Sequence, residues 1–213
     1  MDIIYLGHSS FLLRGKQTTL VTDPYEEKYG LKLPKTEADI VTVSHDHADH
    51  SASNLVQGNP FVVKGPGEYE IKGVKIIGVD SFHDEKEGKD RGKNTIYNIQ
   101  IDGINVCHLG DFGQKELSSQ QQEVIGNVDI LLVPTGGNYT IDAQTATEIA
   151  ALLETKIVIP MHYQDGQTGL QLDPVDKFLK ETGSEKGEKE AKLTVSKEKL
   201  PTEQQVVIME KKV

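Results

Sequence analysis

The run HDHADH at residues 45–50 constrains this chain more than any other feature. It follows DIVTV at residues 39–43, a short β-branched run that predicts a buried strand. In an extended segment residues i and i+2 point the same way, so His45 and His47 can bind one metal ion together. Asp49 and His50 are adjacent, so the chain must turn there, and at the start of a helix expected at 51–56 they would face a second ion. The pattern therefore predicts a metal centre at the end of a strand.

The alternative for this run is a cluster of polar side chains on a solvated loop. Imidazole and carboxylate ligands suit zinc, and also manganese or iron. The absence of thiolates from the cluster argues against a structural zinc site. The single cysteine, Cys107, lies inside a predicted strand, where buried packing is the better interpretation.

Short β-rich runs dominate the first two thirds of the chain, and strands alternate with helices in the last third. Strands are expected at 3–6, 11–13, 19–22, 39–43, 61–63, 74–79, 95–101, 104–107, 129–133, 156–159 and 205–209. Helices are expected at 142–154 and 174–179. This order indicates two sheets with helices packed outside them. We find no internal repeat or linker, so residues 1–213 are expected to form a single domain.

Composition narrows the classes of function. Hydrophobic residues make up 36% and charged residues 26%, which is typical of a globular protein. One cysteine permits no internal disulfide, and a reducing cytoplasm is the expected compartment. The start of the chain lacks the pattern of a signal peptide, and no run approaches the ~20 apolar residues of a membrane span. The net charge of −10 argues against a large nucleic-acid footprint.

HDHADH resembles the signature of the metallo-β-lactamase superfamily, and the resemblance extends over most of the chain. It implies an α/β fold (α+β in some schemes), a four-layer αββα sandwich with mixed sheets and outer helices. It also implies two divalent metal ions, zinc first and manganese or iron as alternatives. The ligands of such a centre come from loops that follow successive strands.

The same resemblance implies the remaining ligands. His83, in SFHD, is similar to the third ligand of the first metal, beside His45 and His47. Asp111, in HLGD, is similar to the carboxylate that bridges both metals, and His162, in IPMHY, to the last ligand of the second metal, beside Asp49 and His50. Each of these residues follows its own predicted strand.

Four further segments point to one branch of the superfamily. GHSSF at 7–11, TDP at 22–24, GPGEYE at 65–70 and RGKN at 91–94 resemble the ascorbate-6-phosphate-lactonase-like (UlaG-like) hydrolases. Many members of that branch have no assigned substrate, so the resemblance implies a type of hydrolase rather than a reaction.

Several residues beyond the expected ligands are candidates for supporting roles. His8 follows the first strand and is a candidate catalytic or substrate-contacting residue, with a strand-capping turn histidine as the alternative. Asp23 is a candidate for orienting a ligating imidazole, or else an ordinary turn aspartate. His108 precedes Asp111 on the same strand exit and is expected to support the site rather than to bind metal.

Arg91 and Lys93 lie in a glycine-flanked loop shortly after His83. They are candidates for binding a phosphate or carboxylate of the substrate. The alternative is a solvated basic loop.

Together these features predict a hydrolase that uses a hydroxide activated by two metals on a small anionic ester, lactone or phosphodiester. Asp49 is expected to bind the second metal and also to act in catalysis by orienting the nucleophile. A nuclease is the first alternative, but the roughly 50 residues between Asp111 and His162 leave no room for an RNA-binding insertion. A non-catalytic metal sensor and a di-iron redox protein are the others. Pairing of copies into a homo-oligomer stays open.

Overall fold

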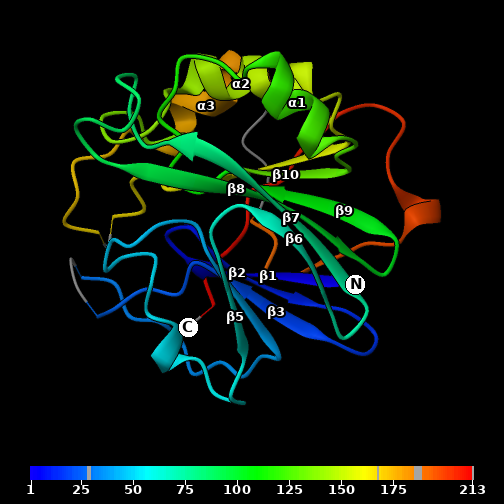
Figure 1. The fold of residues 1–213 in the computed structure, drawn as a ribbon. Helices are drawn as coiled ribbons and strands as arrows, with labels where there is room; N and C mark the ends of the chain where they lie inside the picture. The colour runs from blue at the N-terminus through cyan, green and yellow to red at the C-terminus, as the bar shows by residue number, and fades with distance from the viewer. Residues whose placement is uncertain (28–29, 167, 185–188, 213) are drawn as a thin grey trace.

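The computed structural model describes residues 1–27, 30–166, 168–184 and 189–212, which form two facing β-sheets (Figure 1). The six-stranded sheet has the order β12 (Leu193–Thr194), β1 (Asp2–Gly7), β2 (Ser10–Arg14), β3 (Thr19–Thr22), β4 (Ile40–Val43) and β5 (Phe61–Lys64). The seven-stranded sheet has the order β13 (Gln205–Val206), β11 (Ile157–Met161), β10 (Ile130–Pro134), β9 (Ile104–His108), β8 (Lys93–Ile101), β7 (Val74–Phe82) and β6 (Gly67–Ile71).

Both sheets are mixed, and this positions the site. Strands β1, β2 and β3 pair antiparallel, whereas β3, β4 and β5 pair parallel. In the other sheet β7, β8 and β9 pair antiparallel, whereas β9, β10 and β11 pair parallel. The carboxyl ends of β1, β3 and β4 therefore lie at one edge of their sheet, as do those of β7, β9 and β11 in theirs.

The main core lies between the sheets. In β1 the side chains alternate, so that Ile3 and Tyr5 join the core between the sheets while Ile4 and Leu6 face outward into a second apolar cluster. Burying a side chain of this size contributes about 1.5–3 kcal/mol to stability. Because both faces of β1 are covered, its sequence is a continuous apolar run rather than an alternating one.

The outer layers differ between the two sheets. Helices α1 (Ser119–Ile125), α2 (Ala143–Leu152) and α3 (Val175–Glu181) cover the seven-stranded sheet, as Figure 1 shows. Asp142 caps α2 by accepting the backbone N–H of Thr145, as predicted. Within the described ranges, the outer face of the six-stranded sheet packs against residues around Leu33 and Ala38 and against Val56, which follows the short 3₁₀ helix η1 (Ser53–Leu55).

The predicted mixed α/β sandwich is confirmed, with differences of detail. The helix expected at 51–56 is only the single turn η1. Strand β6 and helix α1 were not predicted, because GEYEI and SQQQEVI lack an apolar run. α1 depends on a capping box between Ser118 and Gln121, and on burial of Ile125.

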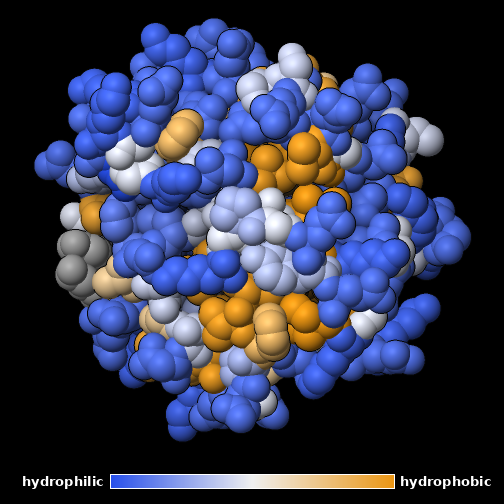
Figure 2. Space-filling view, in the orientation of Figure 1, coloured by the Kyte–Doolittle hydropathy of each residue, from blue (hydrophilic) through white to orange (hydrophobic). Residues whose placement is uncertain are grey.

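The surface in the view of Figure 2 is mostly hydrophilic, with apolar atoms gathered in two patches, one over the region where β5 lies in Figure 1 and one near α1 and β10. Phe61 and Val62 of this edge strand are exposed. Among the described helices, none is both long and apolar enough to cross a lipid bilayer.

Candidate metal centre

The predicted ligands come together at the edge of the sandwich where the carboxyl ends of strands from both sheets meet. The two sheets are joined there directly, because the backbone N–H of His162 donates to the carbonyl of His8 at 2.9 Å. His8, Asp23 and His162 all have positive φ, at 57°, 36° and 51°. Left-handed backbone costs a non-glycine residue about 1–2 kcal/mol, and such strain is typical of functional sites.

Asp111 lies at the middle of the cluster. Its side chain is almost fully buried, and its Oδ2 atom faces four imidazoles. The distances from Oδ2 to Nε2 are 3.2 Å for His50, 3.2 Å for His83, 3.3 Å for His162 and 3.9 Å for His45. A single carboxylate oxygen therefore contacts imidazoles from the segments that follow β4, β7 and β11.

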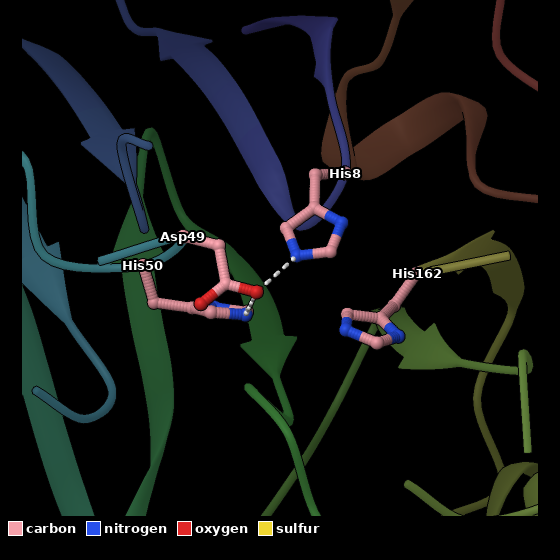
Figure 3. A group of neighbouring side chains, drawn as sticks. All are labelled: His8, Asp49, His50 and His162. Carbon is pink, nitrogen blue, oxygen red and sulfur yellow. Dashed lines mark hydrogen bonds and ion pairs between the residues drawn. The ribbon is translucent and has the colours of Figure 1, made fainter. Parts of the chain in front are cut away.

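The surrounding side chains include two groups that share no residue, each with its ligand atoms within 4.8 Å of one another, and a third, Asp23 with His45 and His50, that overlaps both. Of the first two, one group is His45, His47 and His83, and the other is His8, Asp49, His50 and His162. Figure 3 shows the second group, with Asp49 between His8 and His50 and with His162 facing them. The structure thus brings all seven predicted ligands together, and it adds His8 to the second group.

His8 and Asp49 form a close pair, with Nε2 3.2 Å from Oδ2. Burial and the neighbouring His162 lower the pKa of His8 to about 4, so its ring is neutral at pH 7 in the metal-free protein. Burial alone would raise the pKa of Asp49, but the hydrogen bond from His8 and the charge on His50 hold it below its ordinary value.

Unpaired buried atoms mark the same place. Among the described residues, five buried side-chain atoms of this cluster have no hydrogen-bond partner: His45 Nε2, His50 Nε2, His83 Nδ1, Asp111 Oδ1 and His162 Nδ1. Buried polar atoms are normally paired, and leaving one unpaired costs about 1–3 kcal/mol. Nitrogen and carboxylate donors left unpaired together fit divalent cations such as zinc, manganese or iron.

Asp23 positions two of the imidazoles, one directly and one through Ser44. One of its oxygens lies 2.9 Å from His50 Nδ1 and accepts the Ser44 hydroxyl at 2.5 Å. The other accepts the Ser44 backbone N–H at 2.8 Å, and the Ser44 hydroxyl lies 2.9 Å from His45 Nδ1. Burial raises the pKa of Asp23, but His108 and the hydrogen bond from His50 outweigh it and lower the pKa overall. The predicted contact between Asp23 and an imidazole is thus present, and Ser44 extends it.

The charge balance of the metal-free cluster centres on His50. Burial disfavours its charged form, but Asp111 and Asp23 on its two sides raise its pKa well above the ordinary value. Burial likewise raises the pKa of Asp111, and the nearby His162 and His50 lower it well below its usual range. Burial, and then His50, lowers the pKa of His45 to about 3.

His108 and Asn94 shape the turn that carries Asp111. His108 donates from Nε2 to the Ser9 carbonyl at 2.7 Å and accepts the Gly110 N–H on Nδ1, so it is the neutral tautomer and contacts backbone rather than a candidate ligand. Asn94 Oδ1 accepts the Asp111 N–H at 3.0 Å. Gly110 has a φ of 58°, and a Cβ there would lie 2.4 Å from Asn94 Oδ1, so this turn needs glycine. The positioning roles of Asn94 and Ser44 were missed, because nothing in their local sequence distinguishes them from ordinary loop residues.

The mouth of the cluster is a cavity of about 450 Å³ that Arg91 and Tyr139 border. Arg91 donates to the Asn138 carbonyl at 3.2 Å, and its guanidinium carbon lies 5.6 Å from the centre of the Tyr139 ring. Lys93 instead lines a neighbouring cavity, where its Nζ lies 3.4 Å from Asp80. Both predicted substrate-binding residues therefore line the neighbouring cavity, but only Arg91 also borders the mouth of the cluster.

Comparisons with known proteins place the chain in a family. The model of the β-lactamase superfamily domain matches residues 2–162. A solved structure of a proposed Zn-dependent hydrolase of the metallo-β-lactamase superfamily, from Thermotoga maritima, is 41% identical, with a TM-score of 0.80 over 98% of this chain and 97% of that one. The chain belongs to the metallo-β-lactamase superfamily.

Other relatives agree with this assignment. A UPF0173 metal-dependent hydrolase of Thermococcus onnurineus is 31% identical over 193 residues, covering 76% of this chain and 84% of the relative. The short form of human tRNase Z, at 13% identity and a TM-score of 0.57 over 81% of this chain and 97% of that one, shares the fold alone. The predicted superfamily and the predicted class, an enzyme that is a metal-dependent hydrolase, are confirmed.

Proposed function

We propose that this protein hydrolyses a small anionic ester, lactone or phosphodiester with two divalent metal ions, zinc first, bound at the cluster around Asp111. The observation that carries the proposal is the single Asp111 oxygen that faces His50, His83 and His162, amid buried imidazole nitrogens that lack partners.

The distances between the candidate ligands divide them between two metal sites. His45, His47 and His83 would hold the first ion, and Asp49, His50 and His162 the second. Asp111 would be shared. Two bound cations would lower the pKa of a water toward about 7 and polarise the carbonyl or phosphoryl oxygen of the group under attack.

The chain's own groups do the rest. Asp49 is placed to orient the attacking water, because its carboxylate lies at the mouth and is fixed by His8. Asp49 can take the proton that the attacking water loses and pass it to the leaving oxygen, while the Nε2–H of His8 holds the carboxylate in place. His8 is also anchored through its backbone carbonyl, which accepts the Tyr5 hydroxyl at 2.9 Å.

Two observations favour a small substrate over nucleic acid. The cavity of about 450 Å³ suits a metabolite rather than a polymer. The described chain between Asp111 and His162 forms α1, β10, α2 and β11, all with side chains in the cluster that packs against the seven-stranded sheet, and extends no arm for RNA. The location in a reducing cytoplasm, the single domain over 1–213 and any homo-oligomer stay predictions.

Metal removal tests the proposal. Protein treated with chelator is expected to lose hydrolysis of esters, lactones and phosphodiesters, and to regain it when about two equivalents of Zn²⁺, Mn²⁺ or Fe²⁺ are added. Metal content is measured by elemental analysis beside activity on panels of all three substrate types, with an RNA cleavage assay in parallel. Metal-loaded protein that is inert on the panels while a control enzyme turns over would contradict the proposal, and cleavage of RNA alone would favour the nuclease.

Metal affinity is expected to fall as the pH falls. The raised pKa of His50 means that the metal-free centre carries a proton at pH 7, and a cation must displace it. Apparent affinity should therefore drop about tenfold per pH unit for each proton released. Competition with a chromophoric chelator measures the slope, and calorimetry in two buffers of different ionisation enthalpy counts the protons. An affinity independent of pH would show that His50 is neutral before metal binds.

A further inference from the structure

A second cavity, of about 330 Å³, adjoins the mouth of the metal centre. Asp46, His47 and Arg91 line both spaces, so a molecule at the metal centre can extend from one into the other. Other walls come from the end of β5, with Lys64, from β7, with Asp80, and from the start of β8, with Lys93. We call this space the side pocket.

The side pocket is more cationic than the protein as a whole. Lys64, Arg91 and Lys93 line it against two carboxylates, Asp46 and Asp80, whereas the whole chain carries a net charge of −10. Lys64 pairs with Asp46 and Lys93 with Asp80, and all four side chains are about half exposed or more. Exposed ion pairs contribute at most about 1 kcal/mol, so both lysines can exchange their partners for a bound anion at little cost.

Unlike these two lysines, Arg91 forms no ion pair with a described carboxylate that a bound anion would have to replace. Its guanidinium contacts a neutral carbonyl of Asn138 and the ring of Tyr139. Arginine presents several N–H donors in a planar fork that matches a carboxylate or phosphate. An unbalanced guanidinium between two cavities is therefore placed for an oxyanion.

The loop that carries Arg91 is fixed in advance by a neighbouring carboxylate. Buried Asp84 accepts four backbone N–H groups at 2.8–3.0 Å, from Lys86, Gly88, Asp90 and Arg91 itself. Burial raises the pKa of Asp84, but these four bonds outweigh it and lower the pKa to about 2. Because the backbone of Arg91 is already ordered, binding an anion costs less conformational entropy there.

We propose that the side pocket binds a phosphate or carboxylate group of the substrate that lies at a distance from the bond that is cut. Arg91 and Lys64 select substrates that carry such a group. The preferred substrates are then small esters, lactones or phosphodiesters with a second, terminal oxyanion. This rests on the proposed function, since it takes the Asp111 cluster as the place of cleavage. It extends the sequence prediction by bringing in Lys64 and by separating the anion site from the metals.

Matched substrates test the selection. Three esters share one leaving group and end in a phosphate, a carboxylate or a neutral hydroxyl, and kcat and KM are measured with the metal-loaded full chain. A charged ester is expected to have a kcat/KM at least about tenfold above the neutral one, mainly through KM, and Arg91→Gln or Lys64→Gln should each lower that ratio about tenfold. Lys75→Gln is the control, because Lys75 is exposed on β7 at the end opposite to His83. The ratio for phosphate over carboxylate identifies which oxyanion fits.

A binding measurement separates this inference from the proposed function. Calorimetry follows the phosphate-bearing acid, the product that keeps the terminal group, with wild type and with both variants. Weaker binding to Arg91→Gln and Lys64→Gln supports the side pocket even if none of the three esters is cleaved, an outcome that would count against the proposed function alone. Equal turnover of charged and neutral esters by wild type, or a preference and an affinity that neither substitution alters, would overturn the inference.

Discussion

Replacement of Asp111 by asparagine is expected to lower kcat/KM by about a thousandfold or more, and to leave fewer than two metal ions per chain. Asparagine keeps the shape of the side chain, so the change isolates the charge. One Asp111 oxygen lies within 3.3 Å of His50, His83 and His162, whereas Asp23 contacts His50 directly and is linked to His45 through Ser44. Without the negative charge of Asp111 two cations would repel each other across the site.

The matched control is Glu148→Gln, the same chemical change on the exposed face of α2. Metal content after dialysis and kcat/KM on the best substrate are compared for both variants, and thermal unfolding checks that each is folded. Two retained ions and activity within about tenfold of wild type would show that Asp111 does not bridge the metals.

Replacement of Asp23 by asparagine is expected to weaken metal binding about 10- to 100-fold, although Asp23 contacts His50 at Nδ1 and not at the Nε2 atom that faces Asp111. Its oxygens fix the His50 ring and, through Ser44, the His45 ring. An amide at this position would turn its NH2 group either toward His50 Nδ1–H or toward the Ser44 backbone N–H, because only one of its two terminal atoms is an acceptor. The ligating nitrogens would then be free to rotate away from the cations.

A graded pair of variants distinguishes positioning from general destabilisation. Ser44→Ala removes only the link to His45, so it should weaken affinity less than Asp23→Asn. Both losses should be recovered at high zinc concentration, since positioning changes affinity more than the capacity to react. Affinities of both variants equal to wild type would refute the positioning role, and activity that excess zinc fails to restore would point to misfolding.

The local pattern determined much of the site. HDHADH after a buried strand is enough to predict a metal centre, because strand geometry places His45 and His47 on one side and the following turn brings in His50. The strand ends also predict where His83, Asp111 and His162 emerge. These predictions depend on short-range properties of the chain. The residues meet because the strands that precede them run in the same direction within each sheet and end at one edge.

Only the tertiary structure decided how these residues meet. The contact of His8 with Asp49 spans 41 positions, and that of Asn94 with the Asp111 turn spans 17. The first contact depends on the order of β1, β2, β3 and β4 in one sheet, which no local pattern encodes, and the second on the pairing of β8 with β9. The side pocket likewise depends on Lys64 and Arg91 meeting from separate sheets. The sequence alone predicts the candidate ligands and their order along the chain. The packing of the two sheets determines the distances between them, because a distance across the sandwich depends on every strand that lies between the two residues.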